Sequence, residues 1–412
     1  MKLLNYAMQR FVKTGTLRVI DADGVRHEYA ASPSPSVTVR LTDRRLHRSL
    51  FLNPELHSGE AYMDGTLVIE EGNLRGLLTL YALNRSNLRK QPVQRLVRAV
   101  YKKFRGIYQR NPAAQSRKNV AHHYDLSNEL YGLFLDEGLN YSCAYYLTPD
   151  DSLETAQQNK LRHIAAKLDL KPGQKVLDIG SGWGGMAIYL AQAAGVDVTG
   201  VTLSVEQHGL ATKRAAERGL SDRVRFELKD YRQVTGSFDR IVSVGMFEHV
   251  GIGHYPEFFA KVSSLLADDG VALLHSIGRK GGPGNTGAWV RKYIFPGGYS
   301  PALSETLAAI EGAGLWVTDI EILRLHYAAT LLEWERRFQN NRSRIAELLD
   351  ERFCRMWEFY LIMSEFSFRY GKHMNFQIQL TRKVGTLPLD RGYMAKAEAA
   401  LLKRSSSVTS RS

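Results

Sequence analysis

The feature that most constrains the fold of this chain is a short apolar strand that runs directly into a glycine-rich turn. Residues 176–185 read Val-Leu-Asp-Ile-Gly-Ser-Gly-Trp-Gly-Gly, and a segment with helical spacing follows at 186–194. Glycines let a backbone turn tightly and approach a ligand, while the first turn of a helix offers free N–H groups to an anion. This order predicts a ligand-binding α/β unit, although dinucleotide-binding folds use the same device.

Short apolar runs alternate with helical segments along the middle of the chain. This alternation predicts a parallel, doubly wound α/β sheet with helices on both faces. The expected strands and helices are 175–179, 186–194, 196–202, 205–218, 223–228, 240–244, 255–266 and 271–276. Two later apolar segments, 315–323 and 375–382, are expected to complete the sheet.

The segments on either side of this pattern differ from it. In the first 110 residues, short alternating segments at 17–20, 37–41 and 66–70 predict a small α+β unit with turns between its strands. Between the last two expected strands, residues 331–370 form a long helical stretch rich in Trp, Phe and Tyr. Two interpretations of this stretch stay open: ordinary core helices, or a wall around an apolar substrate.

Two features of the glycine-rich segment narrow the choice of ligand. Asp178 precedes the turn, and after the second expected strand no Asp or Glu stands where the ribose of NAD requires one. Thr202, Leu203 and Gln207 lie there instead. Together these residues resemble the S-adenosylmethionine (SAM) site of Rossmann-like methyltransferases, in which Asp178 would fix the amino-acid end of SAM. An α/β protein with such a turn and no nucleotide ligand is the alternative.

Positive charge is concentrated near the N-terminus. The 412 residues carry a net charge of +13, and residues 1–110 hold 19 Lys and Arg against 9 Asp and Glu. Between Arg85 and Arg110 there are nine basic residues, no acidic one, and an apolar stripe close to helical spacing. A basic amphipathic helix of this kind predicts attachment to an anionic membrane surface. A solvated helix that packs on its own domain and a nucleic-acid-binding helix are the alternatives.

Two further features bear on the compartment in which the protein works. The two cysteines, Cys143 and Cys354, cannot form a disulfide framework, which is typical of a reducing compartment. No apolar run approaches the ~18 residues that a bilayer span requires, and no signal sequence is recognisable. We therefore expect a cytoplasmic protein that associates peripherally with the inner face of the membrane.

Six short motifs, taken in their order along the chain, carry a narrower resemblance. They lie at 123–128 (His-Tyr-Asp-Leu-Ser-Asn), 140–145 (Asn-Tyr-Ser-Cys-Ala-Tyr), 245–251 (Gly-Met-Phe-Glu-His-Val-Gly), 275–278 (His-Ser-Ile-Gly), 292–298 (Lys-Tyr-Ile-Phe-Pro-Gly-Gly) and 326–328 (His-Tyr-Ala). Over about residues 115–385 the chain resembles the cyclopropane-fatty-acid synthases and the related mycolic-acid cyclopropane synthases. Residues 58–65 (Ser-Gly-Glu-Ala-Tyr-Met-Asp-Gly) are similar to the branch that acts on bacterial phospholipids.

The resemblance implies a Rossmann-like class I SAM-dependent methyltransferase fold with helical insertions, preceded by a small N-terminal α+β domain. We expect residues 1–112 to form a basic domain that docks on lipid or membrane. Residues 113–402 are then the catalytic SAM-binding domain. Residues 403–412, rich in Ser, are expected to be a disordered tail.

The resemblance also implies two sets of site residues. The SAM-binding set is Tyr141, Ser142, Asp178, Gly180, Gly182, Gly184, Thr202, Leu203, Gln207, Asp230 and Tyr231. The catalytic set, around a bicarbonate ion near the reactive methyl group, is Cys143, Glu248, His275, Ile277 and Tyr327. Cys143 and Ile277 would act mostly through their backbones. At position 231 the mycolate enzymes usually have Trp, so an aromatic face is retained.

Cyclopropane formation explains why such groups are needed. Attack of a cis double bond on a sulfonium methyl group leaves a carbocation beside a new CH3 group, and ring closure requires one proton to leave that CH3. The base must lie among hydrocarbon, because water would add to the cation and give an alcohol. By the resemblance, a bound bicarbonate would take the proton, and Glu248 and His275 would orient it and relay the proton outward. Glu248 as the base itself is the alternative.

We therefore expect a SAM-dependent cyclopropane synthase that acts on unsaturated acyl chains of membrane phospholipids, with SAM as co-substrate and bicarbonate as ligand. The expected partners are these acyl chains and an anionic membrane surface; no nucleic acid is expected, and homodimer formation is left open. The candidate metal ligands are Glu248, His249, His254 and His275. No pair of them has the spacing of a closed zinc site, so no metal is expected. The alternatives are a lipid C-methyltransferase with methyl-branched or methylene products, a small-molecule N-methyltransferase, an RNA methyltransferase and a non-catalytic lipid-binding module.

Overall fold

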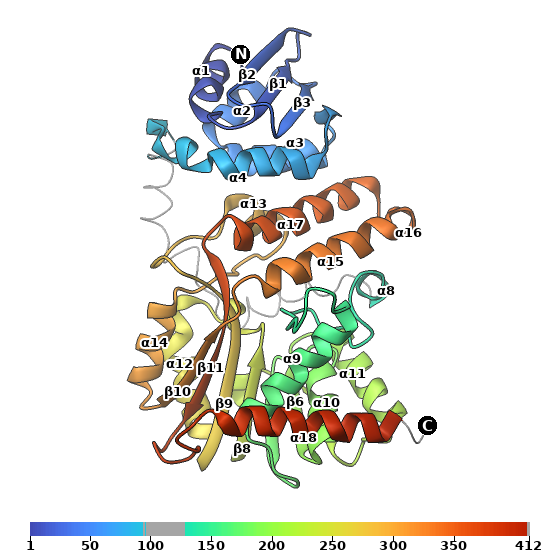
Figure 1. Ribbon diagram of the computed structural model, residues 1–412, viewed down its shortest axis with the longest axis vertical. Helices are drawn as coiled ribbons and strands as arrows, with labels where there is room; N and C mark the ends of the chain where they lie inside the picture. Colours follow the sequence, from blue (N-terminus) through green and yellow to red (C-terminus); the bar gives the residue numbers. More distant parts are fainter. Residues whose placement is uncertain (94, 96–127, 410–412) are drawn as a thin grey trace. The chain divides into compact units, whose positions relative to one another are not determined.

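The computed structural model describes residues 1–93, 95 and 128–409 (Figure 1). Two units share the chain. Unit 1 consists of Met1–Tyr108, Gly284–Pro296 and Leu331–Lys372, and unit 2 consists of Gln109–Pro283, Gly297–Thr330 and His373–Ser412. The units are therefore interleaved in sequence, which differs from the expected division at residue 112. The division into a docking domain and a catalytic domain stays a prediction, and each unit is described by itself.

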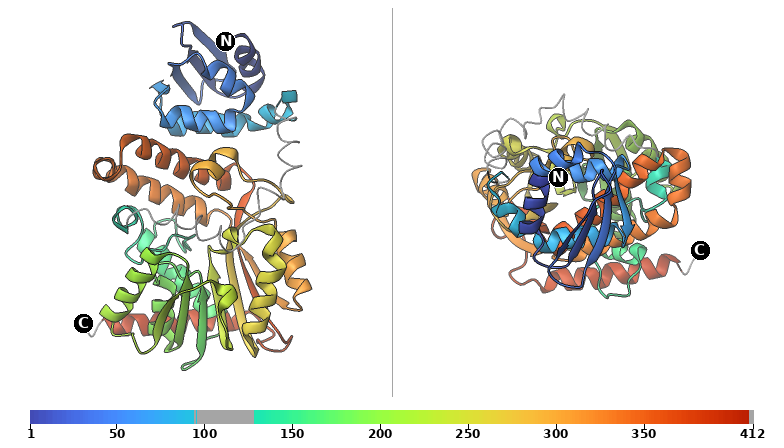
Figure 2. Two further views of the ribbon diagram at one scale, coloured as in Figure 1. Left: turned by 180° about the vertical axis from the view of Figure 1, so that it is seen from behind. Right: turned by 90° about the horizontal axis from the view of Figure 1, so that it is seen from above.

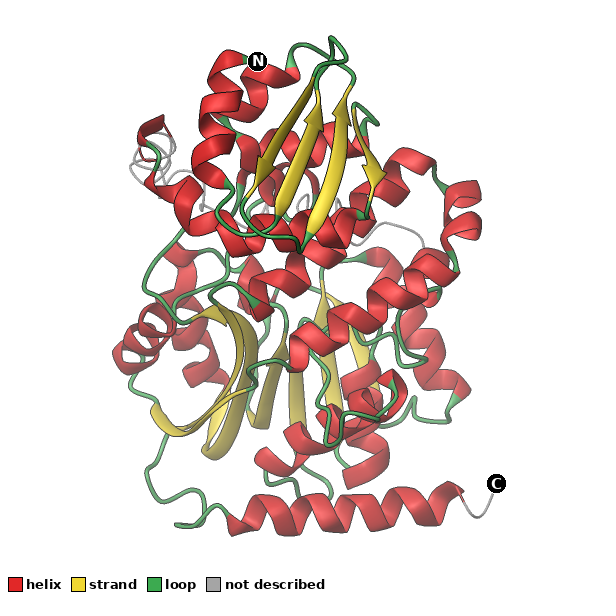
Figure 3. Cartoon of the chain, turned by 45° about the horizontal axis from the view of Figure 1, so that its top comes forward, coloured by secondary structure: helices red, strands yellow, loops and turns green. Residues whose placement is uncertain are grey.

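Unit 1 contains a four-stranded sheet in the order β2-β1-β3-β4. Strands β1 and β3 are parallel, while β2 and β4 pair antiparallel with their neighbours (Figure 3). The strands are β1 (Thr16–Ile20), β2 (Arg26–Ala30), β3 (Ser36–Leu41) and β4 (Leu67–Glu71). Strands β1, β3 and β4 were predicted. Strand β2 was missed because it buries only Tyr29 and so lacks an apolar alternation.

Helices from three parts of the sequence complete unit 1. They are α1 (Lys2–Phe11), α2 (Leu46–Leu52), α3 (Pro54–Met63), α4 (Leu74–Lys90), α13 (Ala288–Tyr293), α15 (His326–Asn340), α16 (Arg342–Leu348) and α17 (Glu351–Arg369). Helix α15 begins in unit 2 and enters unit 1 at Leu331. Helix α4 covers the start of the predicted basic helix, whose residues 94 and 96–110 lie outside the described residues.

The predicted motif at 58–65 lies on and just after α3 and packs against α13. Gly59 leaves room for an indole ring: an added Cβ would lie 2.4 Å from Trp289 Nε1. Next to it, Glu60 Oε1 accepts a hydrogen bond from Lys292 Nζ at 2.6 Å. The motif therefore joins the N-terminal part of unit 1 to a helix from much later in the chain.

Helix α17 is joined to the same part of unit 1. Tyr62 OH donates to Glu358 Oε2 at 2.8 Å. Arg75 donates from Nη1 to Glu365 at 2.5 Å and from Nη2 to Glu335 at 3.0 Å. These contacts bury the charged ends of two α17 carboxylates, because Glu365 and Glu358 expose only 3% and 16% of their side chains. The interpretation of the aromatic helices as a wall around a substrate stays a prediction.

Replacing Gly59 with Ala should destabilise unit 1. Because the new Cβ would overlap a fully buried indole, we expect the free energy of unfolding to fall by about 1–3 kcal/mol. Gly209→Ala is the matched control: Gly209 is an exposed residue of a helix in unit 2, and an added Cβ meets no atom within 4 Å. This control should gain up to ~1 kcal/mol. Urea unfolding followed by tryptophan fluorescence measures both, and equal stabilities would contradict the packing described.

Unit 2 is built on a seven-stranded sheet in the order β10-β11-β9-β8-β5-β6-β7. The strands are β5 (Lys175–Ile179), β6 (Asp197–Thr202), β7 (Val224–Leu228), β8 (Phe238–Val244), β9 (Leu266–Arg279), β10 (Trp316–Ile322) and β11 (His373–Thr381). All seven were predicted, and five neighbours from β9 to β7 are parallel. The prediction of a parallel sheet is wrong for β11, which is antiparallel to β9 and β10. Its first residue pairs with Arg279, the last residue of β9, so β11 enters the sheet from the edge at which the parallel strands end.

Helices cover both faces of this sheet, as the doubly wound prediction requires (Figures 1 and 2). They are α8 (Asn128–Gly132), α9 (Leu153–Lys167), α10 (Gly185–Ala194), α11 (Val205–Glu217), α12 (Tyr255–Leu265), α14 (Leu303–Gly312) and α18 (Gly392–Thr409). Successive residues of β5 point to opposite faces. Leu177 packs in one core with Phe258 and Phe259 of α12, and Val176 packs in the other with Ile164 of α9.

The end of the chain corrects one prediction. Residues 403–409 were expected to be disordered, but they continue helix α18 to Thr409; the last three residues lie outside those described. Leu401 is buried in the core that α9 and α10 share, and the Ala, Lys and Leu residues around it favour a helix. Across the described part of the chain, none of the helices has both the length and the apolar character that a bilayer crossing requires.

Candidate functional site

The glycine-rich turn after β5 forms the floor of the candidate site. Gly180 and Gly184 have φ of +83°, and Gly182 has φ of +54°, a region that favours glycine. The backbone N–H groups of Gly180 and Ser181 both donate to Val201 O of β6, at 2.9 and 3.0 Å. Gly184 is the N-cap of α10. The turn is thus held to the neighbouring strand, with the N-terminus of α10 directly behind it.

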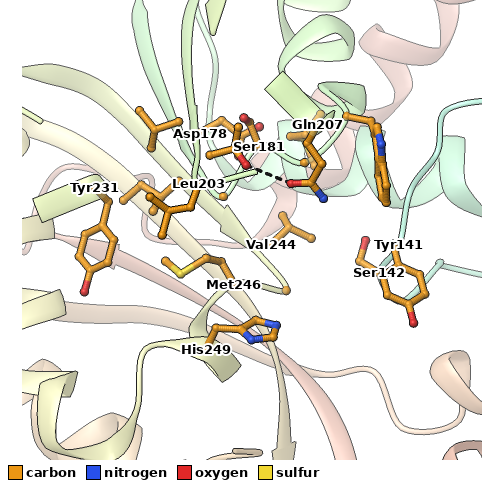
Figure 4. Close-up of a pocket in the computed structure, with 18 of the residues that line it drawn as sticks. Tyr141, Ser142, Asp178, Ser181, Leu203, Gln207, Tyr231, Val244, Met246 and His249 are labelled. Atoms are coloured by element: carbon orange, nitrogen blue, oxygen red, sulfur yellow. Dashed lines mark hydrogen bonds between the residues drawn. The ribbon is translucent and has the colours of Figure 1, made fainter. Parts of the chain in front are cut away.

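A pocket opens above this turn, lined by residues from 139 to 250 (Figure 4). Ten of the eleven predicted SAM-binding residues line it: Tyr141, Ser142, Asp178, Gly180, Gly182, Thr202, Leu203, Gln207, Asp230 and Tyr231. Gly184 does not line the pocket. It packs beneath the turn, where an added Cβ would lie 2.7 Å from Phe226 and 3.1 Å from Ala211.

The wall of the pocket contains an acidic and a basic side chain that interact electrostatically. Asp178 is 2% exposed, its Oδ2 has no hydrogen-bond partner among the described residues, and burial raises its pKa to about 7. Lys160 is 1% exposed, and burial lowers the pKa of its ammonium group to about 8. Its Nζ donates to Asn140 Oδ1 at 3.1 Å and Ser142 Oγ at 3.2 Å. A carboxylate and an ammonium group in one wall fit the two charged ends of an α-amino acid.

Lys160 was missed by the sequence analysis, although a signal for it exists. It lies on α9 on the same face as Ala156 and Ile164, which are both fully buried. A lysine in the apolar stripe of a helix requires a partner, because a buried ammonium group without one is costly.

The opposite side of the pocket holds a hydrogen-bonding amide and an aromatic ring. Thr202 Oγ1 donates to Gln207 Oε1 at 3.0 Å, which fixes the amide at the start of α11 (Figure 4). Asp230 caps the short helix η1 (Tyr231–Gln233) and accepts from Arg232 Nε at 2.9 Å and Nη2 at 2.7 Å. The ring of Tyr231 packs edge-on against Phe258 at 5.3 Å. This ring is a flat apolar wall suited to a purine.

Glu248 lies in η2 (Phe247–His249), just after the end of β8, between two pocket-lining residues, Met246 and His249. Its Oε1 accepts the backbone N–H of Ile277 at 2.6 Å. Its Oε2 is buried and has no partner in the described part of the chain. Burial raises the Glu248 pKa to about 7, against the opposing effects of the Ile277 and Glu248 backbone N–H groups and the nearby Ser276 hydroxyl. A carboxylate with this pKa and a free oxygen is suited to proton transfer near neutral pH.

His275 lies on β9, inside a network of amides. Asn375 and Gln377 of β11 contact its Nε2 and Nδ1 at 2.9 and 3.1 Å. Burial and the charges of Lys160 and Lys167 hold the His275 pKa well below its usual value, so the ring is neutral. Both ring nitrogens are therefore engaged inside the protein.

The remaining predicted catalytic residues are Cys143 and Tyr327. The Cys143 thiol is fully buried beside Asn375, and burial raises its pKa to about 12, so it is not a nucleophile. Tyr327 is buried in the first turn of α15, and Thr330 of that turn accepts the N–H of Ala144 at 3.0 Å.

Contacts with one another or with Asn375 thus bring Cys143, Glu248, His275 and Ile277 to one region, yet none of the five predicted catalytic residues lines the pocket itself. The Ile277 N–H is taken by Glu248, and the predicted role of the Ile277 backbone stays a prediction. Asn375 and Gln377 were missed, although polar residues alternating with apolar ones in a predicted buried strand are a usable signal. Within 1–93, 95 and 128–409, no three His, Cys, Asp or Glu side chains are grouped so as to hold a metal ion. Of the predicted motif at 123–128, only Asn128 is described, and it accepts from Trp183 Nε1 at 2.7 Å.

Solved structures share this fold. Mycolic acid cyclopropane synthase CmaA1, in a complex with SAH and CTAB, matches with a TM-score of 0.61 and 33% identity, covering 66% of this chain and 99% of that one. The sheet order, the glycine-rich turn and the pocket define a SAM-dependent methyltransferase. The family model described as mycolic acid cyclopropane synthetase matches residues 111–378, and the chain belongs to this family. The resemblance and the fold class predicted from the motifs are confirmed.

Two relatives with assigned names show how broad the chemistry of this family is. The cyclopropane-fatty-acyl-phospholipid synthase of Escherichia coli K12 is 44% identical over 262 residues, 64% of this chain and 67% of that protein. A probable fatty acid methyltransferase of Pseudomonas putida is 36% identical over 354 residues, 84% of this chain and 87% of that protein. The shared activity is SAM-dependent modification of lipids.

Proposed function

We propose that the protein adds a methylene group from SAM to the cis double bond of unsaturated acyl chains in membrane phospholipids, forming a cyclopropane ring. The observation that carries this proposal is Glu248, a buried carboxylate beside the SAM pocket with one unpartnered oxygen in the described structure and a pKa of about 7. A simple methyl transfer to a nucleophile needs no such group. Ring closure does, because a carbon-bound proton must leave.

The reaction balances with the groups available. The π electrons of the alkene attack the methyl carbon of SAM, the sulfur–carbon bond breaks, and S-adenosylhomocysteine departs. The cation that remains loses a proton from the new CH3 group, and the electrons of that C–H bond close the ring. Asp178 and Lys160 hold the amino-acid end of SAM, and Tyr231 lies against its adenine. Burial of Glu248 and His275 keeps water from the cation.

The residues around Glu248 fit a bicarbonate ion. Its hydroxyl needs an acceptor, and Glu248 Oε2 is a buried acceptor without a partner among the described side chains. Bound there, bicarbonate would supply a small proton acceptor close to the cation. Glu248 would hold the ion and pass the proton on; Glu248 acting directly as the base is the alternative.

Product analysis tests the activity. Purified protein with SAM and unsaturated phospholipid vesicles should yield acyl chains that are heavier by one CH2 unit, and saturated vesicles are the control. NMR of the product separates a ring from a branch. A methyl-branched or methylene product would instead favour the second candidate, a fatty-acyl C-methyltransferase, which the Pseudomonas putida relative named as a probable fatty acid methyltransferase supports.

The basic run at 85–110 supports docking on an anionic membrane, an argument made from the sequence alone. Changing Arg95, Arg98, Lys102 and Lys103 to Ser should weaken binding to anionic vesicles about 100-fold or more, at ~1 kcal/mol for each charge. Co-sedimentation with vesicles measures this, and added salt should weaken the unmodified protein in the same way. A control variant with equal charge change replaces four exposed residues of unit 2: Lys171, Lys175, Lys213 and Arg225. Equal binding by both variants would reject a dedicated docking segment.

A further inference from the structure

Strand β11 carries a row of buried amides that the proposed mechanism does not use. Asn375, Gln377 and Gln379 alternate with apolar residues and are only 1–2% exposed. Such a row is costly unless each amide finds hydrogen-bond partners. The strand register pairs Gln377 with His275 and Asn375 with Ile277, so these two amides lie beside predicted catalytic residues.

Lys167 determines which way the Gln377 amide points. The Lys167 ammonium group has only hydrogens to donate, and its Nζ lies 2.7 Å from Gln377 Oε1. The NH2 end of the same amide then donates to His275 Nδ1 at 3.1 Å. His275 Nδ1 therefore carries the lone pair and not the proton.

The protonation of His275 in turn determines the orientation of Asn375. A neutral imidazole has one N–H, which must then be on Nε2. This N–H needs an acceptor, and the atom that meets it at 2.9 Å belongs to the Asn375 amide. Oxygen and nitrogen of an amide have nearly the same shape, so their assignment follows from the network. The network therefore requires the Asn375 Oδ1 to face His275 Nε2. The Asn375 NH2 then takes the other position of the amide, which is buried and has no partner among the described residues.

Two of the groups predicted around the anion are already occupied. The Ile277 N–H is taken by Glu248, and both ring nitrogens of His275 are taken by amides, so neither residue offers the anion a donor from these atoms. The Asn375 amide lies next to the thiol of Cys143, a residue whose backbone is expected to bind the anion. Its NH2 is the buried donor that the network leaves over.

We infer that Asn375 donates its side-chain NH2 to the small anion of the catalytic site, in an orientation that Lys167 sets through Gln377 and His275. This inference rests on the proposed function, since the anion is part of it. Asn375 contacts the anion, whereas Gln377 and Lys167 are positioning residues. The charge of Lys167 thus determines, through Gln377 and His275, the direction in which the Asn375 NH2 donates.

The protonation state of His275 is the first test, and it does not depend on activity. Protein labelled with ¹⁵N-histidine should give a His275 signal, assigned by its loss in His275→Gln, with the proton on Nε2 in long-range ¹H–¹⁵N spectra. Gln377→Leu should lose this single form. A proton on Nδ1, or a charged ring at neutral pH, would overturn the inference.

Titration with bicarbonate, followed through the same His275 signals, is the second test. Asn375→Leu removes the donor with little change of volume and should raise the apparent Kd for bicarbonate about 10-fold or more. Gln379→Leu is the matched control, because it removes a buried amide of the same strand that contacts Lys167 O and Tyr393 OH. It should bind bicarbonate like the unmodified protein.

The outcomes separate the two proposals. If the unmodified protein binds bicarbonate and Asn375→Leu binds it equally well, the inference about Asn375 is wrong and the proposed function stands. If bicarbonate neither binds the unmodified protein nor supports its activity, the anion of the proposed function is wrong and the inference falls with it. Thermal unfolding of each variant shows whether an affinity change reflects a loss of fold.

Discussion

Glu248→Gln is expected to lower turnover by about 10²–10⁴-fold while SAM still binds. Glutamine retains the oxygen that accepts the Ile277 N–H at 2.6 Å, so the local fold should persist. The substitution replaces Oε2, an acceptor without a partner among the described residues, by an NH2 donor. It therefore removes either the group that receives the proton or the group that holds the bicarbonate which receives it. Turnover with vesicles and SAM affinity by calorimetry measure the two effects separately. Glu257→Gln, at a carboxylate that is 50% exposed, is the control and should act normally.

The same residue predicts a pH dependence. Because burial raises the pKa of Glu248 to about 7, its ionised fraction falls as the pH drops below 7. The ionised form is the one that takes up a proton. At saturating SAM, where the titration of Asp178 and Lys160 in the free pocket no longer enters, kcat should fall about tenfold for each pH unit below ~7 and level off above it. Glu248→Gln should lose this acidic limb. Near-normal turnover, or an unchanged limb in the variant, would remove Glu248 from the mechanism.

Gly180→Val is expected to weaken SAM binding by more than about 100-fold. At φ of +83° a β-branched residue is strained, and an added Cβ would lie 2.6 Å from Met246 Cβ. Val must therefore displace the turn or the Met246 backbone, and both line the pocket. Calorimetric titration with SAM measures the loss, and unfolding of the ligand-free protein should show a parallel loss of stability.

Gly182→Ala separates strain in the turn from filling of the pocket. Gly182 also has positive φ, but an added Cβ there meets no protein atom within 4 Å. The ligand-free protein should lose only about 1 kcal/mol of stability. SAM affinity should still fall, because the new methyl group would take up space in the pocket. Equal destabilisation by both variants would contradict the close approach of Gly180 to Met246.

Much of unit 2 could be predicted because its strands are fully buried. Runs such as 175–179 and 271–276 are apolar on both faces, and the glycines after β5 mark the turn directly. The direction of β11 could not be predicted, since it depends on the edge at which the chain returns after α17. The grouping of α13 and α17 with the N-terminal strands could not be predicted either, because it depends on contacts between segments that are far apart in the sequence. It rests on pairs such as Gly59 with Trp289, which no local pattern connects.

The residues of the candidate site also divide into those that could be predicted from the sequence and those that could not. Most of the predicted SAM-binding residues lie at or after strand ends and were recognisable from their motifs, and ten of the eleven line one pocket. Lys160, Asn375 and Gln377 are polar residues inside apolar patterns, where periodicity alone assigns them to the core. Their importance appears only when each donor and acceptor is given a partner.

The contacts of α3 and α4 with α13 and α17 bear on how residues 1–93 were gained or lost in evolution. A chain shortened by residues 1–93 would uncover the Trp289 indole and leave the Glu365 carboxylate with Arg369 but without Arg75. The result would be an exposed apolar surface beside a carboxylate that has lost one of its two arginine partners. Shorter homologues should therefore carry other side chains at these two positions. A recombinant of a long and a short member of the family would have to exchange residues 1–93 together with α13 and α17.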